Sequence, residues 1–136
     1  MQKVYRDDIS VVLCGEAGAG IQTVEIVVSR IFKDAGFNLF TSKEYMSRVR
    51  GGSNSTQLRI SSKPIDCYCD RIDVFVPLDK NAYGHLRHRI TAETAILADK
   101  KTVGDLDKPF IDIALSDFAR EIGGAIFSNI IAGGII

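Results

Sequence analysis

The chain has 136 residues, 46% of them apolar, which is enough for one globular domain with a buried core and argues against disorder. Lysine plus arginine and aspartate plus glutamate number 17 each, so the net charge is zero. No long-range electrostatic field therefore draws the chain to nucleic acid or to an anionic membrane, and we expect it to bind neither.

The N-terminal segment, residues 1–8, lacks the apolar core of a signal peptide. No stretch of the sequence reaches the roughly 18 unbroken apolar residues that a helix needs to span a bilayer. We therefore expect a cytoplasmic protein. Cys14, Cys67 and Cys69 are odd in number, and a reducing compartment keeps them as thiols, so they do not indicate a disulfide framework.

The first half of the chain predicts alternating strands and helices. The β-branched run at 9–14 stops at a glycine and suits a strand buried on both faces of a parallel sheet. Apolar residues then recur every three or four positions from Ile21 to Ala35, which predicts a helix that ends at Gly36. A second strand is predicted at 37–42, so these segments form a β-α-β unit of a parallel sheet.

The next segment, 56–61, alternates polar and apolar residues, as expected for a strand with one face in water at the edge of the sheet. The later elements are a strand at 72–76, a short helix capped by Asp79 that runs to about Arg89, strands at 94–98 and 110–114, and a helix beginning at Ser116 or Asp117. Together they predict an α/β fold, a Rossmann-like three-layer sandwich with a mostly parallel sheet.

The last segment, 126–136, is apolar and has no polar finish. An exposed end of this kind would favour aggregation. We therefore expect residues 1–136 to form a single, partial domain of a longer protein, truncated at its C-terminus.

A glycine-rich loop, Gly15-Glu16-Ala17-Gly18-Ala19-Gly20, lies between the first strand and the first helix. Glycine permits a tight turn there, and the free amides and positive dipole end of the helix start can hold a phosphate or carboxylate. A P-loop needs lysine and then serine or threonine after its last glycine, whereas this chain has Ile21 and Gln22, so NTP hydrolysis is not expected. Alternatively, the glycines only let the helix pack against the sheet.

A second loop, 44–54, contains Arg48, Arg50 and the pair Gly51-Gly52. The planar donor fork of arginine and the exposed amides of a glycine pair both bind phosphate or carboxylate. Both loops leave the carboxyl ends of strands that we predict to be neighbours, where an open α/β sheet binds ligands and partners. The alternative interpretation is a solvated basic turn before an edge strand.

Together, Gly-Glu-Ala-Gly-x-Gly-Ile at 15–21 and Glu-Tyr-Met-Ser-Arg-Val-Arg-Gly-Gly-Ser-Asn at 44–54 resemble the 2-oxoacid:ferredoxin oxidoreductases, and the resemblance covers essentially the whole chain. It is to the family's gamma domain, in the form that begins 2-oxoglutarate-type alpha subunits. The resemblance implies a component of an enzyme that carries out the coenzyme A-dependent oxidative decarboxylation of a 2-oxoacid and passes electrons to ferredoxin.

The resemblance further implies that thiamine diphosphate, iron–sulfur clusters and coenzyme A belong to the parent complex, and that this domain holds no cofactor, metal ligand or catalytic residue and is inactive alone. Its expected partners are the other domains and subunits and, through the complex, ferredoxin. The residues to which it assigns a loop or interface role, with coenzyme A contact as one such role, are Gly15, Gly18, Gly20, Arg50, Gly51, Gly52 and Asn54. Ala19 and Ser53 depart from the family pattern, which has glutamine and histidine there.

Two other functions stay open. A free-standing NADP-type Rossmann module would receive the ribose phosphate at Ser42 and Lys43, although the glycine spacing is not Gly-x-Gly-x-x-Gly. A purely structural interaction domain would use both glycine loops for packing.

Two residue groups are assigned no chemistry. Cys67-Tyr68-Cys69 lacks the further ligands of a metal or cluster site. His85 and His88 lie among arginines on a predicted helix, which is typical of a solvated face.

Overall fold

The computed structural model describes residues 7–46, 52–124 and 128–136. Within these residues, six strands form one sheet in the order β2-β3-β1-β4-β5-β6. The strands are β1 (Asp8–Glu16), β2 (Asn38–Glu44), β3 (Ser53–Ser61), β4 (Val74–Pro77), β5 (Ala95–Ala98) and β6 (Ile111–Asp112). The helices are α1 (Ile21–Asp34), α2 (Lys80–Leu86), the 3-10 helix η2 (Arg87–Arg89), α3 (Lys100–Val103), α4 (Leu115–Ile122) and α5 (Ser128–Ile135).

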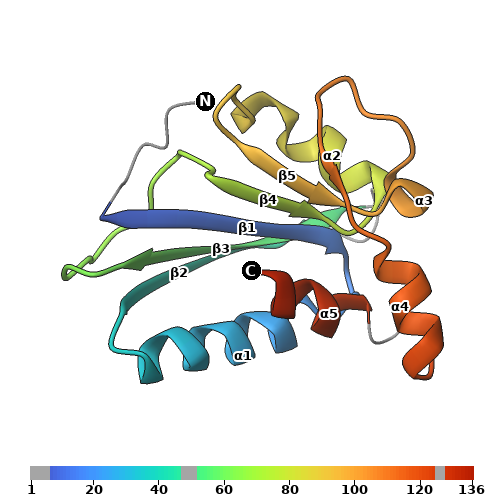
Figure 1. The fold of residues 1–136 in the computed structure, drawn as a ribbon. Coiled ribbons are helices and arrows are strands. Elements are labelled where there is room, and N and C mark those ends of the chain that lie inside the picture. The colour runs from blue at the N-terminus through green and yellow to red at the C-terminus, as the bar shows by residue number, and fades with distance from the viewer. Residues whose placement is uncertain (1–6, 47–51, 125–127) are drawn as a thin grey trace.

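The sheet is mostly parallel, and helices cover both of its faces. Strands β1, β4, β5 and β6 pair in parallel, while β3 runs antiparallel to both β1 and β2. Helices α1 and α5 lie on one face of the sheet and α2 on the other (Figure 1). This arrangement confirms the predicted three-layer α/β fold.

The middle of β1 feeds a hydrophobic core on each face, because its successive side chains point to opposite sides. Val11 and Leu13 pack on the α1 face, and Val12 and Cys14 pack on the α2 face. All four are essentially inaccessible to solvent. The first strand is therefore buried on both faces, as its unbroken apolar run predicted.

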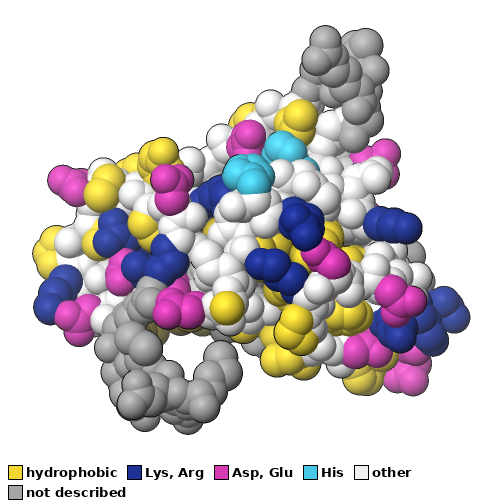
Figure 2. Space-filling view, turned by 90° about the horizontal axis from the view of Figure 1, so that it is seen from above, with side chains coloured by type: hydrophobic (Ala, Val, Ile, Leu, Met, Phe, Trp, Pro, Cys, Tyr) yellow, Lys and Arg dark blue, Asp and Glu magenta, His cyan; other side chains and the backbone are white. Residues whose placement is uncertain are grey.

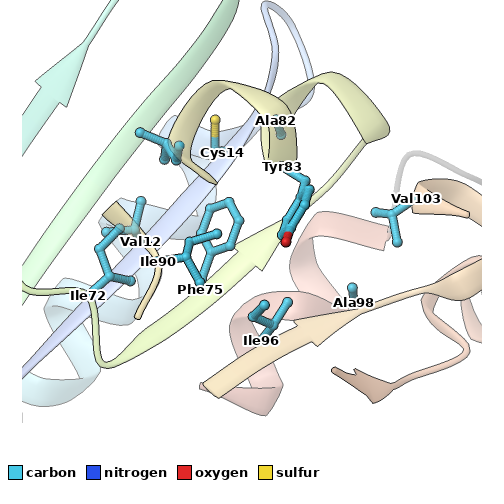
Figure 3. Packing of buried hydrophobic residues seen from close by; sticks show 11 residues of the cluster. Val12, Cys14, Ile72, Phe75, Ala82, Tyr83, Ile90, Ile96, Ala98 and Val103 are labelled. Atoms are coloured by element: carbon cyan, nitrogen blue, oxygen red, sulfur yellow. The ribbon is translucent and has the colours of Figure 1, made fainter. Parts of the chain in front are cut away.

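On the α2 face, Phe75 of β4 lies beneath Ala82 and Tyr83 of α2 (Figure 3). Phe75 is fully buried, and burial of such a side chain contributes about 1.5–3 kcal/mol. Asp79 begins α2 as predicted, since its Oδ1 accepts a hydrogen bond of 2.8 Å from the Ala82 amide. The packing of Phe75 against α2 and the Asp79 cap together hold this helix at the end of β1.

The prediction that 56–61 forms an edge strand with one wet face is wrong. Strand β3 pairs with β1 along its whole length and with β2 over residues 55–61. Polar and apolar residues do alternate along β3, but the segment 62–72 covers the face that carries Gln57 and Arg59. Arg59 donates to the Cys67 carbonyl at 3.0 Å, and Gln57 donates to the Cys69 carbonyl. Backbone carbonyls thus take the place of water against this face.

The apolar C-terminal segment forms a helix where none was predicted. Helix α5 packs against α1, and Ala132 is buried in the core on that face. Gly133 lies so close to α1 that a Cβ there would stand 2.9 Å from Cγ1 of Val24. The other elements lie near their predicted positions, except that the strand predicted at 110–114 shortens to β6 and α3 was not predicted.

Candidate functional site

The two predicted loops reach the same edge of the sheet. Gly15 of β1 pairs with Asn54 of β3, and Glu44 of β2 pairs with Ser55. Both loops therefore meet at the carboxyl ends of β1 and β2, as expected. The two strands are not neighbours, however, because β3 is inserted between them. The second loop therefore joins adjacent antiparallel strands, β2 and β3, and the start of β3 lies between the two loops.

A pocket of about 250 Å³ opens where the glycine loop meets the ends of β2 and β3. Three of the seven predicted residues line it, namely Gly18, Gly20 and Asn54. Its complete lining is Glu16, Gly18, Ala19, Gly20, Ile21, Gln22, Thr23, Tyr45, Asn54, Ser55 and Thr56. The sequence thus identified the loops that build the pocket but not the contributions of α1, of β3 and of Tyr45, which follows β2.

Glycine is required at two positions of the loop by backbone conformation. Gly18 has φ +96° and Gly20 has φ 74°, both in the left-handed region that other residues rarely adopt. Gly20 is the residue before the first turn of α1, and no side chain caps that turn. No side-chain acceptor therefore competes for the backbone amides at the start of α1, where Gly20, Ile21 and Gln22 line the pocket.

Gly15 has a different role. A Cβ on Gly15 would lie 3.0 Å from the Cβ of Leu78, so this glycine lets the β4–α2 connection pass close to β1. The Leu78 amide donates to the Cys14 carbonyl at 2.8 Å, and Asp79 Oδ2 accepts from the Glu16 amide at 2.8 Å. Gly15 thus supports the loop by packing and does not line the pocket.

Tyr45 and Gln22 close the pocket from opposite sides. Gln22 Nε2 donates to the Tyr45 hydroxyl at 3.2 Å, joining the first turn of α1 to the end of β2. Neither residue was predicted, because a contact between positions 23 residues apart depends on the register of β2 beside β3. The amide and hydroxyl offer further hydrogen-bonding groups for an anionic ligand, whereas the Glu16 side chain adds a negative charge to the lining.

The base of the second loop is held by Asn54, whose Oδ1 accepts a hydrogen bond of 3.1 Å from the Met46 amide. Gly52 is buried beside it. Arg50 and Gly51 lie outside the described residues, as does Arg48. The hydrogen bond between Met46 and Asn54 therefore joins the two ends of the loop.

The thiols and imidazoles do not form a reactive centre in the described part of the chain. Burial, reinforced by the nearby carboxylates of Asp79 and Glu44, raises the pKa of Cys14 to about 12, so its thiol stays protonated at neutral pH. No group of three or more histidine, cysteine or acidic side chains is arranged to hold a metal ion among the described residues. The two histidines lie next to each other on the α2 side of the molecule (Figure 2).

None of the described helices is both long and apolar enough to cross a membrane. The longest, α1, exposes the apolar side chains of Ile26 and Ile31 and, towards its C-terminal end, the charged side chains of Arg30 and Lys33.

Residues 10–136 match the model of the pyruvate ferredoxin/flavodoxin oxidoreductase family. The chain belongs to this family. The match includes the glycine loop, the pocket and every described helix, so the resemblance identified from the two loop motifs is confirmed.

Individual relatives agree with the family match. The chain is 26% identical over 133 residues to the 2-oxoglutarate synthase subunit KorC of Archaeoglobus fulgidus, covering 95% of this chain and 69% of that subunit. It is also 26% identical to the 2-oxoglutarate:ferredoxin oxidoreductase of Magnetococcus marinus, a structure with 2-oxoglutarate, coenzyme A and succinyl-CoA bound. That similarity has a TM-score of 0.82 and covers 94% of this chain but only 23% of the other.

The fold is shared with a separate gamma subunit. A keto/oxoacid ferredoxin oxidoreductase gamma subunit from Geobacter sulfurreducens superposes with a TM-score of 0.76 at 20% identity, over 95% of this chain and 74% of that one. The chain is thus homologous to subunits of 2-oxoacid:ferredoxin oxidoreductases. These comparisons give no support to a free-standing NADP-type module.

Proposed function

We propose that this chain is the gamma-type component of a cytoplasmic 2-oxoacid:ferredoxin oxidoreductase of the 2-oxoglutarate type. The complex would oxidatively decarboxylate the 2-oxoacid, form its coenzyme A thioester and pass the electrons to ferredoxin. One observation carries the proposal: in a member of this family, the glycine loop and the ends of β2 and β3 build a pocket at the ligand-binding edge of the sheet. The chain contributes that edge to the complex.

The donor groups of the pocket fit a phosphate or carboxylate better than a metal or a cluster. Uncapped amides at the start of α1 suit an anion, and Gln22, Tyr45 and Asn54 add neutral polar groups. We therefore propose that this edge contacts an anionic part of coenzyme A, with Gly18, Gly20 and Asn54 in the contact. Arg50 and Gly51 are proposed to join it from outside the described residues.

Other cofactors are assigned elsewhere. Iron–sulfur clusters require several cysteine thiolates, and the described residues gather no such set, so we place the clusters and thiamine diphosphate in the other domains or subunits. Thiamine diphosphate and the clusters supply the decarboxylation and electron-transfer chemistry when bound. The residues of this chain are proposed to bind and orient coenzyme A and to shield it from water. No proton transfer or covalent step is assigned to them.

The proposal is tested by reconstitution. The chain alone should show no 2-oxoglutarate-dependent reduction of ferredoxin in the presence of coenzyme A. Added to the remaining subunits of its complex, it should restore that activity in proportion to its occupancy, up to one copy per active site. Turnover by the purified chain, or full activity of the complex without it, would contradict the proposed function. The same assay with pyruvate in place of 2-oxoglutarate tests the substrate type.

A further inference from the structure

A second groove, of about 440 Å³, lies between the base of the 44–54 loop and α2. Gly52 and Ser53 line one side of it, and Lys80, Gly84 and His85 line the other. The groove adjoins the glycine-loop pocket at the base of the 44–54 loop, but the two share no lining residue, so the groove is a distinct surface feature. Its lining contains two features that are unfavourable for the isolated chain.

The first is Lys80, at the first position of α2. A cation at a helix N-terminus is repelled by the positive end of the helix dipole, and the first turn of α2 contains no acidic residue. Asp79, the cap, instead accepts hydrogen bonds from the amides of Glu16 and Ala82. Among the described residues, no carboxylate forms an ion pair with the Lys80 ammonium. Its positive charge is thus directed outward at an electrostatic cost to the helix.

The second is Gly84, inside α2. Glycine weakens a helix relative to alanine, because more backbone freedom is lost on folding. Gly84 has no positive φ that would require glycine, and a Cβ built on it meets no atom within 4 Å. The packing of this chain therefore gives no reason for a glycine at this position. A helical glycine with open space beside it permits another backbone to approach closely.

His85 also lines the groove, but its Nε2 faces Glu44 of this chain and not a partner. Its Nε2 is inaccessible to solvent and has no hydrogen-bond partner among the described residues, and it lies 3.5 Å from the Glu44 carboxylate. The imidazole also lines a neighbouring groove of about 420 Å³, which includes His88 and Arg89. Among the described residues, Lys80 is the one permanently charged side chain that lines the 440 Å³ groove, whereas the neighbouring groove is lined by Glu44 and Asp70 as well as Arg89.

We propose that this groove is a docking site for an acidic, extended segment of another subunit, whose backbone passes over Gly84 while a carboxylate pairs with Lys80. The inference rests on the proposed function, since it assumes that the chain joins a multi-subunit complex. The groove is open to solvent, as a site for a peptide segment must be. The two unfavourable features of α2 are then explained together, because each is offset on binding.

The test compares the stability of the isolated chain with its affinity for the remaining subunits of the complex, measured by calorimetric titration. Gly84→Ala should raise the Tm of the isolated chain by about 2–4 °C and weaken assembly, and Gly84→Leu should weaken assembly about tenfold or more. Lys80→Met should weaken assembly several-fold and make it less dependent on salt.

Two matched controls are available in the chain. Gly134 is a helical glycine of α5 that is exposed and also has open space beside it, so Gly134→Ala should stabilise the chain with no effect on assembly. Lys33 is an exposed lysine in the last turn of α1, so Lys33→Met should leave affinity and salt dependence unchanged.

The outcomes separate the two proposals. If the wild-type chain fails to assemble, the proposed function fails and the docking site with it. If the wild type assembles and Gly84→Leu binds as tightly, the docking site alone is overturned. Inorganic phosphate that shifts the NMR signals of Gly84 and His85, combined with assembly indifferent to every variant, would identify a small-anion site and equally overturn the proposal.

Discussion

Individual glycines in this chain have different physical roles, although they look alike in the sequence. Gly18 and Gly20 are needed for their left-handed backbone, whereas Gly15 is needed for the space that Leu78 occupies. The first pair lines the pocket and the third supports it from behind. A motif search treats the three as equivalent, although they differ in backbone conformation and in their position relative to the pocket.

At the same scale, ionisable residues hold the α2 layer together. Asp107, between α3 and β6, accepts hydrogen bonds from Arg87 and Tyr83. The Arg87 guanidinium and the Tyr83 hydroxyl lower the pKa of Asp107 to about 2. Burial, together with the bond to Asp107, raises the pKa of Tyr83 to about 12. The loop before β6 is thus tied to α2 by a carboxylate that stays ionised in mild acid.

This arrangement predicts a defined pH dependence. Because the folded pKa of Asp107 lies below its ordinary value of 3.8, its stabilisation is fully present above that value and is lost as the pH falls through about 2. Asp107→Asn should therefore lower the urea midpoint at pH 7 and lose its effect near pH 2. Urea unfolding of both proteins from pH 2 to 7 tests this, and an effect that is constant over the range would be evidence against the arrangement.

At the scale of elements, the C-terminal helix depends on close approach. A Cβ on Gly133 would meet Cγ1 of Val24 at 2.9 Å, while the neighbouring Gly134 has open space. Gly133→Ala should destabilise the chain by about 1–3 kcal/mol through overpacking between α1 and α5. Gly134→Ala should be neutral or stabilising by up to about 1 kcal/mol. Thermal unfolding of the pair measures the difference, and equal Tm values would show that α5 does not pack as described.

The sequence predicted most strands and helices because their apolar periodicity matches their burial. The prediction was wrong where polar side chains form hydrogen bonds with the protein backbone and not with water. Gln57 and Arg59 alternate with apolar residues as in an exposed edge strand, but they bind carbonyls of the segment 62–72. Helix α5 was missed because Gly133 and Gly134 have low helix propensity, which packing against α1 overrides.

The candidate site was predictable to a similar degree. The two loops were found from their glycines, and the rule for parallel sheets placed them at one edge. The insertion of β3 between β1 and β2 could not be predicted, because local patterns carry no information about which strands pair. The contact of Gln22 with Tyr45 follows from that pairing and was missed for the same reason.

At the scale of the whole molecule, the chain is a compact α/β unit with two different surfaces beside its loop-bearing edge. The glycine-loop pocket lies at the start of α1, whose first turn has no side-chain cap, and the groove along α2 is lined by Lys80 and Gly84. The chain is a member of the pyruvate ferredoxin/flavodoxin oxidoreductase family, and both surfaces lie on the side of the molecule to which its two loop motifs belong. The role proposed for the chain is to present coenzyme A to a reaction centre built by its partners.

The most direct test of that role is the KM for coenzyme A of the reconstituted complex, with either of two glycines replaced. Gly18→Ala and Gly36→Ala place the same strain on a left-handed residue with open space around it, at about 1–2 kcal/mol each, but only Gly18 lines the pocket. We predict that Gly18→Ala raises the KM for coenzyme A severalfold and that Gly36→Ala leaves it unchanged. An unchanged KM in both variants, with normal assembly, would contradict the account.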